Sequence, residues 1–365
     1  MTDRAFLDLA ARAALRAMGD VEPNPMVGAV LVKAGVVIGI GHHKRFGGPH
    51  AEREALADAR ARGHDPNGCT AYVTLEPCSH HGKTPPCTDA LIEAGVARVV
   101  AARPDPNPVS AGGARVLRDA GIPCDFCGDS DLALHVGDPF VKRTTSALPF
   151  LIAKWAQFHD GRLVTRPDED RWISGPTARR RVHRLRARVD AILTGIGTVL
   201  ADDPLLTARD VARVRRVARR VVLDPSLRTP SDAALVRTAG DTPIIIACTR
   251  TADPARAADL RSRGVEVVEV RSDPHGLDLD ALLRWLARAH HVTTILTEAG
   301  PRLLASLFAA RLVDLALIHT APAPDPCARP LLPAFVPPGW RTVRERALAS
   351  DTEGVLAPPL GSAIA

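Results

Sequence analysis

Three short fragments in the first half of the chain carry side chains that could hold a metal ion and move protons. His50-Ala51-Glu52 supplies an imidazole and a carboxylate, and Cys78 and Cys87 supply two thiolates. One imidazole and two thiolates suit zinc, and three protein ligands leave a fourth tetrahedral position open, which is typical of a catalytic site. Glu52 is not needed as a ligand, so we expect it to act as general acid and base.

The order of these fragments is typical of hydrolytic deaminases. Zinc enzymes that deaminate nucleobases carry His-x-Glu followed by Pro-Cys-x-x-Cys, and the glutamate carries the protons. Here eight residues separate Cys78 from Cys87. Each fragment is weak evidence alone, but together and in this order they favour a deaminase. A non-catalytic alternative stays open, in which zinc is a structural clip, the second half is a nucleotide sensor, and replacing Glu52 changes nothing measurable.

The ligand-bearing fragments are predicted at the ends of regular elements. Residues 49–62 should form a helix that Pro49 opens and Gly63 closes, and residues 71–75 a strand that leads towards Cys78. A further helix is expected to begin near Cys87 and to end at Gly95. Helix N-termini at His50 and Cys87 would favour the thiolate form of the cysteine.

The rest of the chain alternates between strand and helix patterns, which predicts an α/β fold in two domains, residues 1–147 and 148–365. Residues 128–149 show no regular pattern, and the last 45 residues, rich in proline and alanine, give no clear assignment. Further strands are expected near 26–32, 36–40, 96–101, 150–156, 190–194, 220–224, 243–248, 265–270, 293–297 and 313–319, and further helices near 4–18, 113–120, 176–187, 254–263, 278–289 and 301–310.

Composition narrows the class of protein. The formal net charge is +6, with arginine the main basic residue, which suits phosphorylated metabolites, dinucleotides or nucleic acid. Arg179–Arg181 and Arg213–Arg220 are nevertheless interpreted as solvated faces. The chain has neither a secretory signal pattern nor an apolar run of membrane-spanning length, so we expect a cytoplasmic protein without membrane contact. The remaining five cysteines are predicted to be inert: Cys69, Cys124, Cys127, Cys248 and Cys327.

Motifs in the first half resemble the bifunctional deaminase–reductases of riboflavin biosynthesis. The resemblance is carried by Pro23-Asn-Pro-Met-Val-Gly28, by His50-Ala-Glu52 and by the long segment Pro77-Cys-Ser-His-His-Gly-Lys-Thr-Pro-Pro-Cys87, with Asp105-Pro-Asn-Pro108 in support. It implies a cytidine-deaminase-like α/β/α sandwich followed by a dihydrofolate-reductase-like α/β domain. The implied cofactors are Zn²⁺ and NADPH, and the implied enzyme is both hydrolase and oxidoreductase.

The resemblance also implies the substrate and the order of the two reactions. The substrate would be 2,5-diamino-6-ribosylamino-4(3H)-pyrimidinone 5′-phosphate, which is first deaminated and then reduced from ribosyl to ribityl. Asn24 would contact the pyrimidine, and residues 80–84 would help to shape the pocket. The partners expected are therefore small phosphorylated pyrimidines rather than nucleic acid, with a homo-oligomer compatible with the sequence.

In the second half the resemblance is carried by Lys154, Asp160-Gly161, Trp172-Ile173, Arg186 and the segment from Thr198 to Arg209. By position it implies that Lys154 polarises the reacting sugar. The residues implied to meet NADPH are Ala156, Trp172, Thr198, Asp202 and the turn that starts at Gly300. Those implied to meet the substrate are Asp170, Arg186, Leu206, Arg209 and Glu298. Arginines suit a phosphate because their planar fork binds two oxygens at once.

Several positions depart from the family pattern. Phe158-His159 precede Asp160, Asp170 replaces a phosphate-contacting serine, and Pro225 replaces a cofactor-contacting serine. One alternative is therefore a deaminase whose reductase half is inactive or altered. Another is a deaminase of nucleic acid, such as a tRNA adenosine deaminase, although the first half lacks a basic stripe with aromatic residues.

Overall fold

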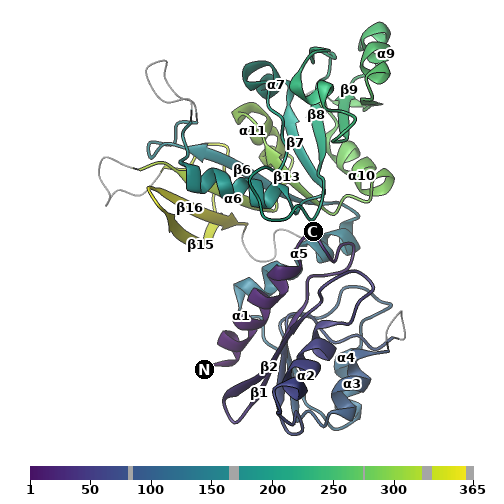
Figure 1. The fold of residues 1–365 in the computed structure, drawn as a ribbon, viewed down its shortest axis with the longest axis vertical. Helices are drawn as coiled ribbons and strands as arrows, with labels where there is room; N and C mark the ends of the chain where they lie inside the picture. The colour runs from purple at the N-terminus through teal and green to yellow at the C-terminus, as the bar shows by residue number, and fades with distance from the viewer. Residues whose placement is uncertain (81–84, 164–171, 274–275, 323–330, 359–365) are drawn as a thin grey trace. The chain divides into compact units, whose positions relative to one another are not determined.

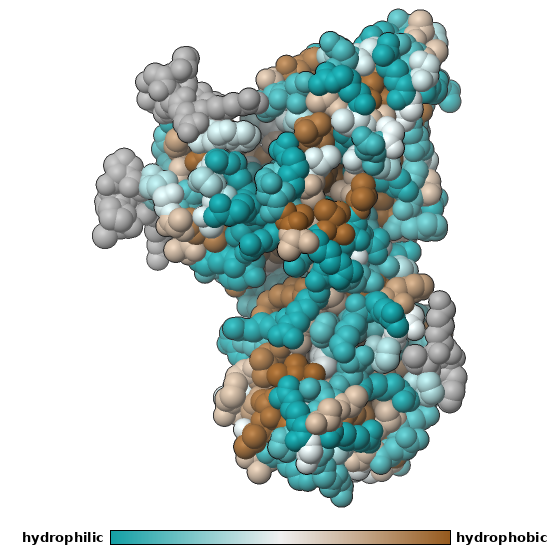
Figure 2. Space-filling model, in the orientation of Figure 1, coloured by the Kyte–Doolittle hydropathy of each residue, from teal (hydrophilic) through white to brown (hydrophobic). Residues whose placement is uncertain are grey.

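The protein is represented by a computed structural model that describes residues 1–80, 85–163, 172–273, 276–322 and 331–358 (Figure 1). The chain forms two compact units, Met1–Ala147 and Leu148–Ala365. Among the described residues no helix combines the length and the apolarity that crossing a membrane requires. On the face drawn in Figure 2, hydrophilic side chains predominate in each unit, and apolar groups are scattered among them.

The first unit is a three-layer α/β/α sandwich. Its sheet has the order β2-β1-β3-β4-β5, with β1 antiparallel to both neighbours and β3, β4 and β5 parallel. One apolar core contains residues of α2, α3 and α4 and the other contains residues of α1 and α5, so helices cover both faces. The strands are β1 (Gly28–Lys33), β2 (Val36–His42), β3 (Thr70–Val73), β4 (Arg98–Ala101) and β5 (Cys124–Phe126), and the helices are α1 (Asp3–Ala14), α2 (Ala51–Ala61), α3 (Cys87–Glu93), α4 (Gly113–Asp119) and α5 (Asp131–Ser146), with a short 3₁₀ turn at Leu15–Ala17.

Two glycines bring the ligand-bearing segments close to their supports. A Cβ on Gly41 of β2 would lie 2.2 Å from the carbonyl oxygen of Ala51, at the start of α2. A Cβ on Gly113 of α4 would lie 1.8 Å from the carbonyl oxygen of Pro77, next to Cys78. Both distances are far below van der Waals contact, so only glycine permits this packing.

The interpretation of residues 128–149 as irregular is wrong, because α5 occupies most of this segment. Ser130 caps it by accepting a hydrogen bond from the Ala133 amide at 3.0 Å. The pattern hides the helix because its buried stripe includes Gly137 and Lys142, and because Pro139 lies inside it. Short or polar buried side chains give little hydrophobic periodicity.

The second unit contains a nine-stranded sheet of order β10-β9-β8-β7-β13-β6-β14-β16-β15. The strands from β10 to β14 run parallel, and β16 and β15 extend the sheet as an antiparallel hairpin. The strands are β6 (Phe150–Gln157), β7 (Ala191–Gly195), β8 (Arg219–Leu223), β9 (Ile244–Cys248), β10 (Glu266–Glu269), β13 (Thr294–Glu298), β14 (Leu315–Thr320), β15 (Arg341–Leu348) and β16 (Asp351–Ala357), with the small pair β11 (Ser272–Asp273) and β12 (Gly276–Leu277) beside them.

Within the described residues, six helices accompany this sheet, and the apolar core includes residues of β6, β7, β13, α10 and α11. They are α6 (Pro176–Arg186), α7 (Ile196–Asp202), α8 (Ala234–Arg237), α9 (Pro254–Ser262), α10 (Leu279–Ala289) and α11 (Pro301–Ala309). The mixed α/β architecture agrees with the predicted fold class. The short helices α7 and α8 and the hairpin β15–β16 were not predicted, the hairpin because charged residues interrupt its alternation.

The interpretation of the arginine runs as solvated faces is wrong at several positions, among them Arg220 and Arg181. Arg220 of β8 is fully buried, and its guanidinium donates to the Thr238 hydroxyl at 2.7 Å and to the Leu205 carbonyl at 3.4 Å. Burial lowers the pKa of Arg220 to about 10. Arg181 of α6 is half-buried in an ion pair with Glu353. Both arginines are structural cations, which the local sequence does not distinguish from surface ones.

Candidate functional site

The three predicted metal ligands converge in the first unit. His50 is the N-cap of α2, Cys78 follows β3, and Cys87 is the first residue of α3. The His50 Nδ1 atom lies 3.5 Å from Cys78 Sγ and 3.3 Å from Cys87 Sγ, and all three ligand atoms lie within 4.8 Å of one another. Tetrahedral zinc with ordinary bond lengths would separate nitrogen from sulfur by about 3.6 Å. The donor set and its spacing therefore fit zinc.

Electrostatics prepares one of the two thiols for a cation. A hydrogen bond from Cys87 is the main cause that lowers the pKa of Cys78 to about 4, and His50 contributes to the same effect. The same hydrogen bond, together with burial, raises the pKa of Cys87 well above its usual range. The backbone amide of Cys87 also donates to Cys78 Sγ at 3.4 Å. One thiolate is thus already favoured, and a bound cation would displace the second proton.

Glu52 lies beside this cluster in the first turn of α2, with only 3% of its surface exposed. Burial raises the pKa of the Glu52 carboxyl above its ordinary value. A carboxyl group of raised pKa can both accept and return a proton near neutral pH. Glu52 therefore lies next to the three predicted ligands, and it lines a cavity that opens onto them.

A cavity of about 290 Å³ opens onto the cluster. Asn24 lines it, and its Nδ2 lies 3.2 Å from His43 Nε2, while His43 Nδ1 lies 2.9 Å from the Pro49 carbonyl oxygen. If Nδ1 donates to that carbonyl, Nε2 accepts from the Asn24 amide. The Asn24 side-chain oxygen is then available to the cavity. Of residues 80–84, His80 lines the cavity and 81–84 lie outside the described residues.

A buried acidic pair, Glu76 and Asp105, also lines the cavity. Glu76 accepts backbone hydrogen bonds from Asp105 at 3.0 Å and from Ala114 at 2.9 Å. Asp105 in turn accepts from the Ser110 hydroxyl at 2.6 Å, and burial raises the pKa of Asp105. Glu76 thereby ties the segment before Cys78 to the 105–110 loop. Glu76 was not singled out from the sequence, and its place directly before Pro77-Cys78 was the available signal.

In the second unit, the predicted Lys154 meets two other predicted residues. Lys154 of β6 lies in register with Glu298 of β13, so their side chains share one face of the sheet. Arg186, the last residue of α6, forms a bidentate pair with Glu298 at 2.6 and 2.9 Å. Burial lowers the pKa of Lys154, although Glu298 acts in the opposite direction. Burial would raise the pKa of Glu298, but Arg186 and Lys154 outweigh it and hold that pKa below its usual value.

Comparison with known proteins places both units in one family. Residues 1–103 match the model of the cytidine and deoxycytidylate deaminase zinc-binding region, and residues 149–323 match that of the RibD C-terminal domain. The riboflavin biosynthesis protein RibD of Aquifex aeolicus is 38% identical over 88% of this chain and 87% of its own. That of Escherichia coli is 40% identical over 88% of each. This chain belongs to the RibD family of riboflavin biosynthesis proteins.

A solved structure supports the assignment over the whole length. The diaminohydroxyphosphoribosylaminopyrimidine deaminase/5-amino-6-(5-phosphoribosylamino)uracil reductase of Thermotoga maritima is 32% identical, with a TM-score of 0.75 over 98% of both chains. The expectation of a riboflavin-biosynthesis enzyme with a zinc-binding deaminase domain and a reductase domain is confirmed. The cofactors of this RibD family member are zinc and NADPH.

The remaining predicted reductase residues cluster around the carboxyl ends of the parallel strands. Leu206 is buried with a positive φ of 49°, and the neighbouring Thr207 carbonyl accepts from Arg186 at 3.1 Å. The exposed Trp172 ring lies 5.1 Å from the Arg179 guanidinium. Asp170 lies outside the described residues. The other predicted positions fall on β6, on α7, just after α7 and at the start of α11: Ala156, Thr198, Asp202, Arg209 and Gly300.

The start of α11, where Gly300 was predicted to meet NADPH, is an open helix N-terminus. Gly300 is the N-cap of α11 and, within the described residues, its helix start has no side-chain cap. A Cβ added at Gly300 would meet no described atom within 4 Å, so the approach is open. Helix N-termini with free amides bind phosphate. The neighbouring strand β7 also ends in a helix start, at Gly195.

Proposed function

We propose that this enzyme performs two consecutive steps of riboflavin biosynthesis. The first is the hydrolytic deamination of 2,5-diamino-6-ribosylamino-4(3H)-pyrimidinone 5′-phosphate, with release of ammonia. The second is the NADPH-dependent reduction of the ribosyl side chain to ribityl. The observation that carries the proposal is the convergence of His50, Cys78 and Cys87 beside buried Glu52, in a chain whose second unit matches the RibD C-terminal domain. The activities printed for the Thermotoga maritima relative support it.

In the deaminase unit, His50, Cys78 and Cys87 hold the zinc ion. Zinc bound there supplies the Lewis acidity that makes water nucleophilic at neutral pH. Glu52 takes a proton from the attacking water at its carboxylate and delivers it to the departing amino group, so that ammonia leaves. The Asn24 side-chain oxygen, oriented by His43, accepts a hydrogen bond from the pyrimidine.

In the reductase unit, NADPH supplies the reducing electrons. Lys154 polarises the sugar carbon that is reduced, and Glu298, in register with it on the neighbouring strand, favours its charged form. Arg186 and Arg209 bind the substrate through their guanidinium groups, and Leu206 packs against it. The residues assigned to NADPH are Ala156, Trp172, Thr198, Asp202 and Gly300. Asp170 is assigned to the substrate site by sequence position.

Two properties beyond the chemistry belong to the same proposal. All six cysteines among the described residues are free, which supports the reducing cytoplasm as the compartment. We also propose a homo-oligomer, supported by β15, which is the outermost strand of the large sheet and offers an edge for pairing. Light scattering of the purified protein measures the oligomeric state directly.

A coupled assay tests both activities in one sample. Purified enzyme with the diaminopyrimidine phosphate and NADPH should release ammonia and then lose absorbance at the nicotinamide band. Ammonia without NADPH oxidation, even with the deaminated intermediate supplied, would refute the reductase half. Inosine formation in tRNA without turnover of the pyrimidine would refute the substrate assignment.

A further inference from the structure

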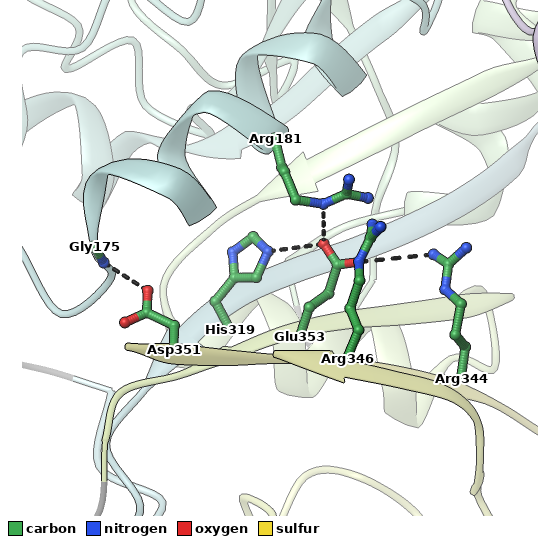
Figure 3. A network of polar contacts seen from close by, with 7 residues as sticks. All are labelled: Gly175, Arg181, His319, Arg344, Arg346, Asp351 and Glu353. Carbon is green, nitrogen blue, oxygen red and sulfur yellow. Dashed lines mark hydrogen bonds and ion pairs between the residues drawn. The ribbon is translucent and has the colours of Figure 1, made fainter. Parts of the chain in front are cut away.

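A buried carboxylate that is not among the assigned reductase residues contacts three arginines and a histidine. Glu353 of β16 has a fully buried side chain. It accepts from Arg181 Nε at 2.6 Å and from Arg346 Nε at 2.7 Å, and it lies 3.2 Å from His319 Nε2 (Figure 3). Burial would raise the pKa of Glu353, but His319 and Arg181 outweigh it and hold that pKa low. An ion that is taken out of water at this cost needs its partners.

The network belongs to the face of the sheet that carries the reductase site. Glu353 lies in register with His319 of β14, and His319 lies in register with Ala156 of β6. Residues in register share a face of the sheet, so the network continues the row that contains Ala156. The same face carries Lys154, two residues earlier on β6.

Polar contacts from β16 tie helix α6 to this face. Its sequence contains five arginines and no acidic residue, and only Ala178 and Val182 are buried. Like charges three or four residues apart destabilise a helix, so carboxylates from outside the helix stabilise it. β16 provides two of them. Asp351 accepts from the Gly175 amide at the helix start at 2.6 Å, and Glu353 binds Arg181 in the middle of the helix (Figure 3).

The position of α6 in turn determines where the Arg186 guanidinium lies. Arg186 is the last residue of the helix and pairs with Glu298, which faces Lys154. Any shift or rotation of α6 moves this guanidinium relative to Glu298 and to the sugar phosphate. A misplacement of about 1 Å can cost about a hundredfold in rate.

We propose that the carboxylates of β16, Glu353 above all, are positioning residues that fix α6 and thereby aim Arg186 at the substrate of the reductase. The hairpin β15–β16 lies beyond residues 149–323, which match the family model of the reductase domain. The inference rests on the proposed role of Arg186 in substrate binding. Neither Glu353 nor Asp351 touches the reacting groups.

The test uses the full-length enzyme, whose deaminase activity is an internal control. Glu353→Gln removes the charge with little change of shape, and Glu345→Gln on exposed β15 is the matched control. In Glu353→Gln, we expect the KM for the deaminated intermediate to rise about tenfold to a hundredfold with a smaller change in kcat. Ammonia release should stay at the wild-type rate in both variants. An unchanged KM in Glu353→Gln would overturn the proposal.

A second pair of variants covers the case in which Glu353→Gln destabilises the hairpin. Arg181→Gln leaves Glu353 with His319 and the β15 arginines, and the neighbouring Arg180→Gln is its control. Arg181→Gln should raise the same KM, Arg181→Lys should restore most of the affinity, and Arg180→Gln should match wild type. Equal KM values for Arg181→Gln and Arg180→Gln would contradict the positioning role.

Hydrogen exchange separates this proposal from the proposed function. If the wild type does not oxidise NADPH at all, the assignment of the reductase fails. The anchoring of α6 is then still measurable without activity. Backbone amides of residues 177–186 should exchange about tenfold faster in Arg181→Gln than in Arg180→Gln, because the helix has lost its central anchor. Equal exchange would overturn the anchoring.

Discussion

Gly113→Ala should disable the deaminase from outside its cavity. Gly113 begins α4, and a Cβ there would lie 1.8 Å from the Pro77 carbonyl oxygen, whereas real Cβ contacts are essentially never under 3.0 Å. The backbone must therefore separate by about 1.2 Å at the residue that precedes Cys78. Metal sites tolerate deviations of about 0.2 Å in their ligand distances.

The magnitude follows from that mismatch. Overpacking of this kind costs about 1–3 kcal/mol, and we expect most of it to appear as weaker zinc binding because Cys78 moves with Pro77. A loss of about 1.4 kcal/mol or more corresponds to about tenfold or more in zinc affinity. Ammonia release at limiting zinc should fall by the same factor and recover partly when zinc is added. NADPH oxidation with supplied intermediate should not change.

The matched control is Gly128→Ala, at an exposed glycine where a Cβ would meet no described atom within 4 Å. Zinc affinity is measured by competition with a chromophoric chelator, and ammonia by an enzymatic assay. Wild-type zinc affinity in Gly113→Ala would refute the reasoning, because it would mean that the backbone of α4 had shifted while Cys78 kept its position. An equal loss in Gly128→Ala would refute it as well.

Three further predictions use the separation of the two activities. Glu52→Gln should keep zinc, as elemental analysis would show, and lower ammonia release by about 10²–10⁴-fold because the proton carrier is gone; retained turnover would exclude that role. Removal of zinc by a chelator should stop ammonia release and leave reduction of the supplied intermediate intact, and a parallel loss of both would contradict independent sites. In Glu298→Gln the pKa of Lys154, already lowered by burial, loses the carboxylate that raises it. If protonated Lys154 is the active form, the alkaline limb of the reductase pH profile moves to lower pH, whereas an unmoved limb would exclude Lys154 as the titrating group.

The residues of the candidate deaminase centre could be singled out from the sequence because they lie in short segments of recognisable pattern. His50 and Glu52 lie two residues apart at one helix start, and Cys87 opens another helix, so residue type and local pattern were sufficient. The partner of Asn24 and the tie formed by Glu76 were not predictable in this way. His43 reaches Asn24, and Glu76 reaches Ala114, only after the sheet has formed.

The reductase half was harder to predict for a physical reason. Helix and strand patterns report burial of apolar side chains, yet α6 and the hairpin β15–β16 are joined by buried ions. Arg186 pairs with Glu298, and Arg181 pairs with Glu353; the two partners of each pair are more than a hundred residues apart in the sequence. A charged residue therefore looks solvated in a local window although its charge is neutralised inside the fold. The same reasoning explains why Arg220 was misjudged and why the last strands were missed.

This distribution of charge also gives the basic composition a structural meaning. Four arginines of the second unit, Arg181, Arg186, Arg344 and Arg346, pair with two carboxylates on the sheet, Glu298 on β13 and Glu353 on β16. Such pairs constrain position more than they add stability, because desolvation offsets most of their attraction. An enzyme that must aim an arginine at a sugar phosphate gains from that constraint. We therefore expect substitutions in these pairs to change KM before they change the unfolding temperature, and an early loss of stability at unchanged KM would show that the pairs serve the fold alone.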